Sequence, residues 1–171
     1  MRRGGLSRSA DFFALAGQYK NAAELLFSHF EPGVPRIPIR EPLYFCYHHS
    51  IELALKAFLL AHGTKPSGVP NHDISQIYAE CKKHGFVVKD DENFEVHNLI
   101  SMLHSGNENH FYRYPIENNR IGAGIEWTRD VVARVFEAVA PHVKGSSSLR
   151  SRRMTFGKPV FKPNPNFKNL T

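Results

Sequence analysis

Several features that mark large classes of protein are missing from this chain. It has two cysteines in 171 residues, Cys46 and Cys81, and both fall on apolar helical faces, which predicts buried free thiols rather than a disulfide. No apolar run reaches the roughly 18 residues that favour a membrane-spanning helix. No apolar segment follows the basic first residues, so no secretory signal is predicted. We therefore expect a cytoplasmic protein without membrane contact.

Signals for β-structure and for common catalytic loops are also missing. No segment alternates apolar and polar residues over the length of a strand, and there is no internal repeat. The short glycine pair Gly122 and Gly124 lacks the Lys-Ser or Lys-Thr that a phosphate-binding loop needs. Ser50 and Ser101 have no strand–turn–helix elbow around them. These absences argue against a P-loop nucleotide hydrolase and a serine hydrolase.

Acidic residues are absent from the last part of the chain. The formal net charge is +6, yet residues 144–171 hold seven Lys and Arg and no Asp or Glu, so the preceding part is close to neutral. A basic segment rich in Ser, Arg and Pro is typical of a flexible tail that can contact phosphates. The sequence predicts a flexible N-terminus at 1–9, a helical domain at 10–143 and a basic flexible tail at 144–171.

Apolar residues recur with a helical period in five segments. Proline-rich and glycine-containing links separate them, and the run Asp73-Ile-Ser-Gln76 has the form of a capping box. A loop of about 20 residues precedes the last segment, and such loops are usually functional or disordered. We predict an all-α fold, a five-helix up-and-down bundle with a long loop before the last helix. The expected helices span about 10–30, 44–63, 73–85, 94–104 and 125–143.

The second helical segment carries the most informative pattern. Residues 44–63 are apolar around most of the helix, which predicts burial on several sides. His49, Glu52 and Lys56 form a narrow polar stripe, with His48 on its flank. One interpretation is a solvent-facing strip with an ordinary ion pair between Glu52 and Lys56. The other is a cleft or dimer groove in which His and Lys contact phosphate.

Metal binding is a third interpretation of the same stripe. It depends on the His49-x-x-Glu52 spacing together with His97 and His104, which lie seven positions apart in the fourth segment. Metal sites in helical bundles use Glu-x-x-His pairs on opposed helices, whereas here the order is reversed and no second pair occurs. We therefore predict no metal site and no cofactor.

Further candidate residues lie in the links between helices. His72 precedes the expected helix cap Asp73 and is either a turn residue or a ligand contact. The long loop contains His110, Arg113 and Tyr114. Their side chains either anchor the loop on the bundle, or form an edge that stacks on bases and pairs with phosphate.

Three segments of the chain together resemble one known family. They are the helical run YHHSIELALKAFL at 47–59, the turn Asn71-His72-Asp73-Ile74 and the segment Arg113-Tyr114-Pro115. Over roughly residues 10–140 this pattern resembles the HEPN superfamily, α-helical bundles of prokaryotic defence, toxin–antitoxin and nucleotide-handling systems. The resemblance implies a dimerising bundle and, in many members, metal-independent RNase activity.

The RNase signature of that family does not occur here. It is an Arg followed, after four to six residues, by a His. Arg40 and His48 are eight positions apart, as are Arg134 and His142. We therefore assign no catalytic pair from the resemblance.

The sequence thus predicts a HEPN-like module that binds RNA or a nucleotide in a defence or toxin–antitoxin setting. We expect a homodimer, with an antitoxin or other operon protein as a candidate partner. Two alternatives stay open: a divergent metal-independent RNase using His49 and Arg113, and a non-catalytic protein-interaction or dimerisation domain. The candidate ligand-binding residues are His48, His49, Glu52, Lys56, His72, His110, Arg113 and Tyr114.

Overall fold

All regular structure in the described part of the chain is helical. The computed structural model describes residues 4–28, 40–65, 68–69, 71–91, 94–108 and 124–143. The prediction of an all-α bundle of five helices is confirmed. Within the described ranges no helix has both the length and the apolarity to cross a bilayer. The elements are α1 (Gly4–Phe27), α2 (Arg40–Ala61), α3 (Ile74–Lys83), α4 (Glu95–Glu108), α5 (Ile125–Val139) and the short 3-10 helix η2 (Ala140–His142).

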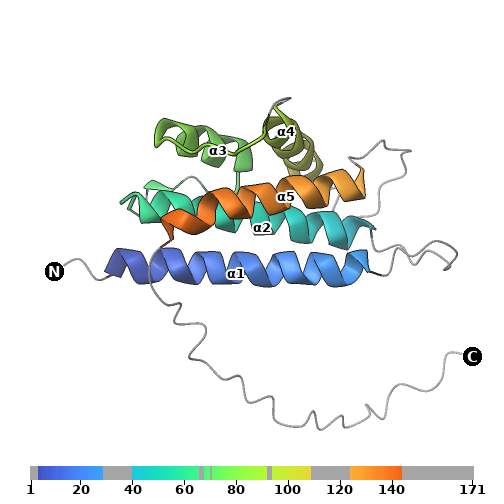
Figure 1. Ribbon diagram of the computed structural model, residues 1–171, viewed down its shortest axis with the longest axis horizontal. Helices are drawn as coiled ribbons and strands as arrows, with labels where there is room; N and C mark the ends of the chain where they lie inside the picture. The colour runs from blue at the N-terminus through green and yellow to red at the C-terminus, as the bar shows by residue number, and fades with distance from the viewer. Residues whose placement is uncertain are drawn as a thin grey trace, which may run out of the picture.

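Helix α2 is the centre of the bundle. It contacts α1, α3, α4 and α5. Figure 1 shows α1 and α2 running antiparallel along the molecule, with α5 beside α2 in the same direction as α2. The shorter helices α3 and α4 lie on the side of α2 away from α1 (Figure 1). This central place explains why the second segment is apolar around most of its circumference.

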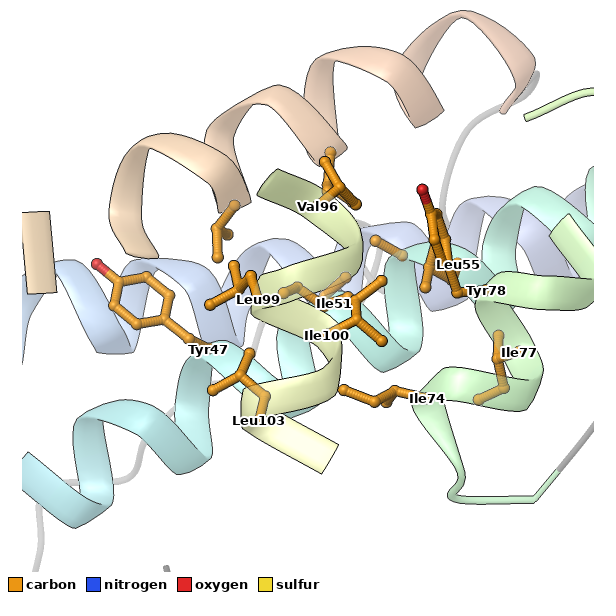
Figure 2. Packing of buried hydrophobic residues seen from close by; sticks show 14 of the residues in the cluster. Tyr47, Ile51, Leu55, Ile74, Ile77, Tyr78, Val96, Leu99, Ile100 and Leu103 are labelled. Carbon is orange, nitrogen blue, oxygen red and sulfur yellow. The ribbon is translucent and has the colours of Figure 1, made fainter. Parts of the chain in front are cut away.

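The core forms where four helices meet α2. Most of the α2 side chains are buried, and Tyr47, Ile51 and Phe58 are fully so. Figure 2 shows Ile100 of α4 and Ile74 of α3 in the same buried cluster as Ile51 of α2. Each such side chain contributes about 1.5–3 kcal/mol by leaving water. The prediction that this helix is buried on several sides is therefore confirmed.

The helix boundaries differ from the predicted ones for local reasons. Helix α1 begins at Gly4 rather than near residue 10, because no proline interrupts residues 4–9 and Ser9 is buried in the bundle. Helix α2 begins at Arg40 and includes Pro42 in its first turn. A proline is tolerated there because the N–H groups of the first turn have no acceptor within the helix. Helix α5 ends at Val139 and continues as η2, whose first turn contains a proline.

A polar link between helices was not visible in the helical periodicity. Glu24 lies on α1. Its Oε2 accepts a hydrogen bond from Nε of Arg129 on α5 at 2.7 Å, and its Oε1 accepts one from the hydroxyl of Tyr47 on α2 at 3.3 Å. The desolvated Tyr47 ring beside this carboxylate has its pKa raised, by burial first and then by Glu24. Glu24 therefore joins three helices.

The cap of α3 gives a first testable expectation. Asp73 Oδ1 accepts hydrogen bonds from the backbone N–H of Ser75 at 2.9 Å and of Gln76 at 3.0 Å. Asp73→Ala is expected to lower the free energy of unfolding by about 1 kcal/mol, measured by urea denaturation at pH 7. Asp73→Asn keeps an acceptor and should lose little. Equal losses in both variants would instead assign the effect to the charge of Asp73, which lies 3.5 Å from Nδ1 of His104.

Candidate functional site

A buried carboxylate on α2, Glu52, is the centre of a polar cluster. Its Oε1 accepts a hydrogen bond from Nζ of Lys56 at 2.8 Å and lies 3.0 Å from Nδ1 of His72. Its Oε2 lies 3.4 Å from Nδ1 of His49. We name these four residues the Glu52 cluster. The Glu52 side chain is 3% exposed, so the interpretation of the stripe as a solvent-facing strip is wrong for its central residue.

Two different features of the chain bring the cluster together. Within α2, His49 and Lys56 lie three residues before and four residues after Glu52, which places all three on one helix face. His72 comes from the segment that enters α3, one residue before the N-cap Asp73. Because α3 packs on α2, this segment is held over the polar face of α2. The helical spacing predicts that His49, Glu52 and Lys56 share a face, but it does not predict that His72 joins them.

Glu52 is ionised in the folded protein. Burial by itself would raise the pKa of this carboxyl, since the charged form is desolvated. Hydrogen bonds from His49 and Lys56, with the charges of the same groups, outweigh burial and hold the pKa of Glu52 at about 2. The Glu52 carboxylate therefore stays charged well below neutral pH.

The ionised carboxylate determines which nitrogens of the two histidines are available. A carboxylate only accepts hydrogen bonds, so a ring nitrogen that bonds to it must carry the proton. In both His49 and His72 that nitrogen is Nδ1. In the neutral ring the other nitrogen, Nε2, then keeps its lone pair. When His49 or His72 is neutral, its proton is therefore on Nδ1 and its Nε2 can accept a proton.

The side chains of the cluster differ in how far they are exposed to solvent. The side chain of His72 is 78% exposed, that of His49 is 25% exposed and that of Lys56 is 12% exposed. The His49 ring packs edge-on against Tyr19 of α1, with ring centroids 4.4 Å apart, and is stacked with Phe45 at 6.0 Å. A ligand would therefore meet His72 first, whereas the His49 ring is partly covered by Tyr19 and Phe45. The contact with Tyr19 joins two helices and had no local signal in the sequence.

The other predicted site residues do not join this cluster in the described part of the chain. His48 is 2% exposed and lies in the core, so it offers no surface to a ligand. His110, Arg113 and Tyr114 lie outside the described residues. His104 faces Asp73 instead of Glu52. The structure thus unites four of the eight candidates.

The described side chains around Glu52 are not arranged as a metal site. Among the described residues no group of three or more His, Cys, Asp and Glu side chains is placed to hold a metal ion. An open hollow of about 490 Å³ lies elsewhere, beside α3 and the start of α4. It is lined by Tyr78, Lys82, Phe86, Val87, Val88, Asp91, Phe94 and His97, none of which belongs to the Glu52 cluster. The hollow and the Glu52 cluster are therefore separate features of the described surface.

Comparisons with known proteins add no identification. No protein-family model, no curated protein and no solved structure matches this chain.

Proposed function

We propose that the chain is a HEPN-like module that binds RNA or a nucleotide through the phosphate groups, with the Glu52 cluster as the contact surface. The proposed setting is prokaryotic defence or a toxin–antitoxin system, with a homodimer as the working form. Two of the three segments that resemble HEPN proteins meet in this cluster, through the 3.0 Å approach of His72 Nδ1 to Glu52 Oε1. This contact supports the proposal because it brings residues of both segments into one site.

One observation carries the proposal: a cation and two imidazoles are held by a single buried carboxylate next to solvent. The Lys56 ammonium has three N–H donors, and one of them bonds to Glu52 at 2.8 Å. Its other donors can bond to a phosphate oxygen, and so can a protonated His72. Because Glu52 fixes the positions of these groups, less side-chain freedom is lost when a ligand binds.

The test compares RNA binding by the full-length chain and by two histidine variants. Fluorescence anisotropy with labelled tRNA and an oligoribonucleotide, at low and at physiological salt, should show binding that weakens with salt. His72→Ala should weaken binding about tenfold, the loss of one charge-assisted hydrogen bond of about 1.4 kcal/mol. His72 is exposed, so this variant is expected to fold.

His97→Ala is the matched control. It removes the same side chain from an exposed position on α4 that is not part of the Glu52 cluster. Its affinity should equal that of the wild type. If the wild type does not bind RNA or nucleotides at low salt, the proposal is wrong. Equal losses in both variants would place binding somewhere other than the Glu52 cluster.

The two imidazoles also favour a second function, metal-independent RNA cleavage. In-line attack by a 2′-hydroxyl needs a base to take its proton, an acid to protonate the leaving oxygen and a cation near the phosphate. His49 and His72 offer an Nε2 each, one in a neutral ring as the base and the other in a protonated ring as the acid, and Lys56 is the cation. Incubation of the wild type, His49→Ala and His72→Ala with RNA in EDTA tests it. Cleavage that is lost in both His49→Ala and His72→Ala supports this function, and cleavage that persists in both excludes the cluster as its source.

A further inference from the structure

Two histidines far apart in the sequence meet at one end of the bundle. Nε2 of His62 lies 3.0 Å from Nδ1 of His142, and the ring centroids are 5.0 Å apart. His62 directly follows α2, and His142 is the last residue of η2 after α5. Helices α2 and α5 end at the same end of the molecule (Figure 1). Neither histidine belongs to the Glu52 cluster, so the proposed function leaves this pair unexplained.

Both rings are held against one buried side chain. The Phe58 ring is fully buried, and its centroid lies 4.2 Å from that of His62 and 4.8 Å from that of His142. The backbone N–H of His62 donates to the carbonyls of Phe58 and Leu59, each at 3.1 Å, which fixes the backbone at this position. The two ring nitrogens are therefore brought together by packing and by the helix end.

We propose that His62 Nε2 and His142 Nδ1 bind one divalent transition-metal ion of the class that prefers imidazole, with Zn²⁺ as the test case. Two nitrogens at about 2.0–2.1 Å from one Zn²⁺ ion are roughly 3.3 Å apart in a tetrahedral site and somewhat closer in an octahedral one. The observed separation of 3.0 Å between the two ring nitrogens falls within that range.

The surroundings of the pair suit a cation. A metal ion binds the neutral imidazole, and in each ring the proton can reside on the nitrogen that faces away from its partner. His62 directly follows the C-terminal end of α2, where the helix dipole favours positive charge.

The site offers two protein ligands. His84 is the nearest further imidazole, with its ring centroid 6.2 Å from that of His62, and its Nε2 lies 3.6 Å from Oε1 of Glu80. No third His, Cys, Asp or Glu is placed around the same point among the residues described. Water molecules therefore complete the coordination, at one more position than in the open zinc sites that have three protein ligands.

An ordinary N–H···N hydrogen bond between the rings would give the same separation. Zinc titration distinguishes the two cases. Isothermal titration calorimetry of ZnCl2 into the tag-free full-length chain should show one bound equivalent. His62→Gln and His142→Gln should each lower the zinc affinity by at least about tenfold, since even an outer-shell partner of a metal site is worth about 10- to 100-fold. Both side chains are exposed, so both variants are expected to fold.

Two further variants locate the binding. His97→Gln is the matched control for loss of an exposed histidine, and His72→Gln tests the Glu52 cluster as a rival zinc site. Both should keep the wild-type affinity and the wild-type rise in Tm with zinc. The proposal is overturned if the wild type does not bind zinc, or if His62→Gln and His142→Gln bind it as the wild type does. Loss of zinc binding in His72→Gln alone would assign the site to the Glu52 cluster and also overturn it.

Discussion

Replacing Glu52 with glutamine is expected to lower the free energy of unfolding at pH 7 by about 3 kcal/mol, the lower end of the range for breaking a buried ion pair. The Glu52 side chain is 3% exposed and that of Lys56 is 12% exposed, so the variant leaves an ammonium group poorly solvated and without its carboxylate. Urea denaturation of the two proteins measures the difference. The lower end of the range applies because the cluster opens to water at His72.

The stability lost in Glu52→Gln should become smaller as the pH falls. The pKa of Glu52 is about 2 in the folded protein, below its ordinary value of 4.5. A carboxyl with a depressed pKa stabilises the fold fully above its unfolded value, and this contribution disappears as the pH falls towards the folded value. The shift corresponds to about 3 kcal/mol at neutral pH. The difference between wild type and Glu52→Gln should therefore shrink from about pH 4.5 down to pH 2.

A paired substitution is the control for this effect. Glu52→Gln combined with Lys56→Met removes both charges, and it should regain part of the stability that Glu52→Gln loses, because no ammonium group is then left unpaired. If Glu52→Gln alone stays within about 0.5 kcal/mol of the wild type, the cluster behaves as an ordinary surface ion pair. A loss that does not change between pH 7 and pH 2 would show that packing, and not charge, is responsible.

The part of the site that lies on one helix could be predicted from the sequence. The i, i+3 and i+4 spacings place His49, Glu52 and Lys56 on one face of any helix that contains them. What covers that face could not be predicted, because it depends on how other elements pack. His72 reaches Glu52 from 20 residues further along the chain, and Tyr19 reaches His49 from α1. Neither contact has a local pattern.

For the fold as well, local features could be predicted from the sequence and contacts between distant segments could not. Apolar period and capping chemistry predicted the number of helices and the buried α2, since both are local properties. They did not predict that Glu24 joins three helices, or that His62 and His142 meet from positions 80 residues apart. Ten histidines in 171 residues offer many pairs, and spacing alone does not single out the pairs that meet in space.

The second large effect on stability is expected when Phe58 is truncated, because its ring packs against both the core and the histidine pair. Its side chain is fully buried and lies against Phe86, with ring centroids 4.9 Å apart, as well as against His62 and His142. Phe58→Ala should lower the free energy of unfolding by about 3–5 kcal/mol, through lost burial and the cavity that remains. Phe58→Leu fills most of that space and should lose no more than about 1.5 kcal/mol.

Phe94→Ala is the matched control, because it deletes the same ring from a side chain that is 72% exposed. It should stay within about 0.5 kcal/mol of the wild type. All variants are compared by urea denaturation, so that even a strongly destabilised one is measured from its folded baseline. A loss below about 1 kcal/mol in Phe58→Ala would contradict the packing of this end of α2.

Phe58→Leu should also keep zinc binding, because the backbone of His62 and that of His142 stay in place. This variant therefore separates the stability of the core from the zinc binding of the histidine pair.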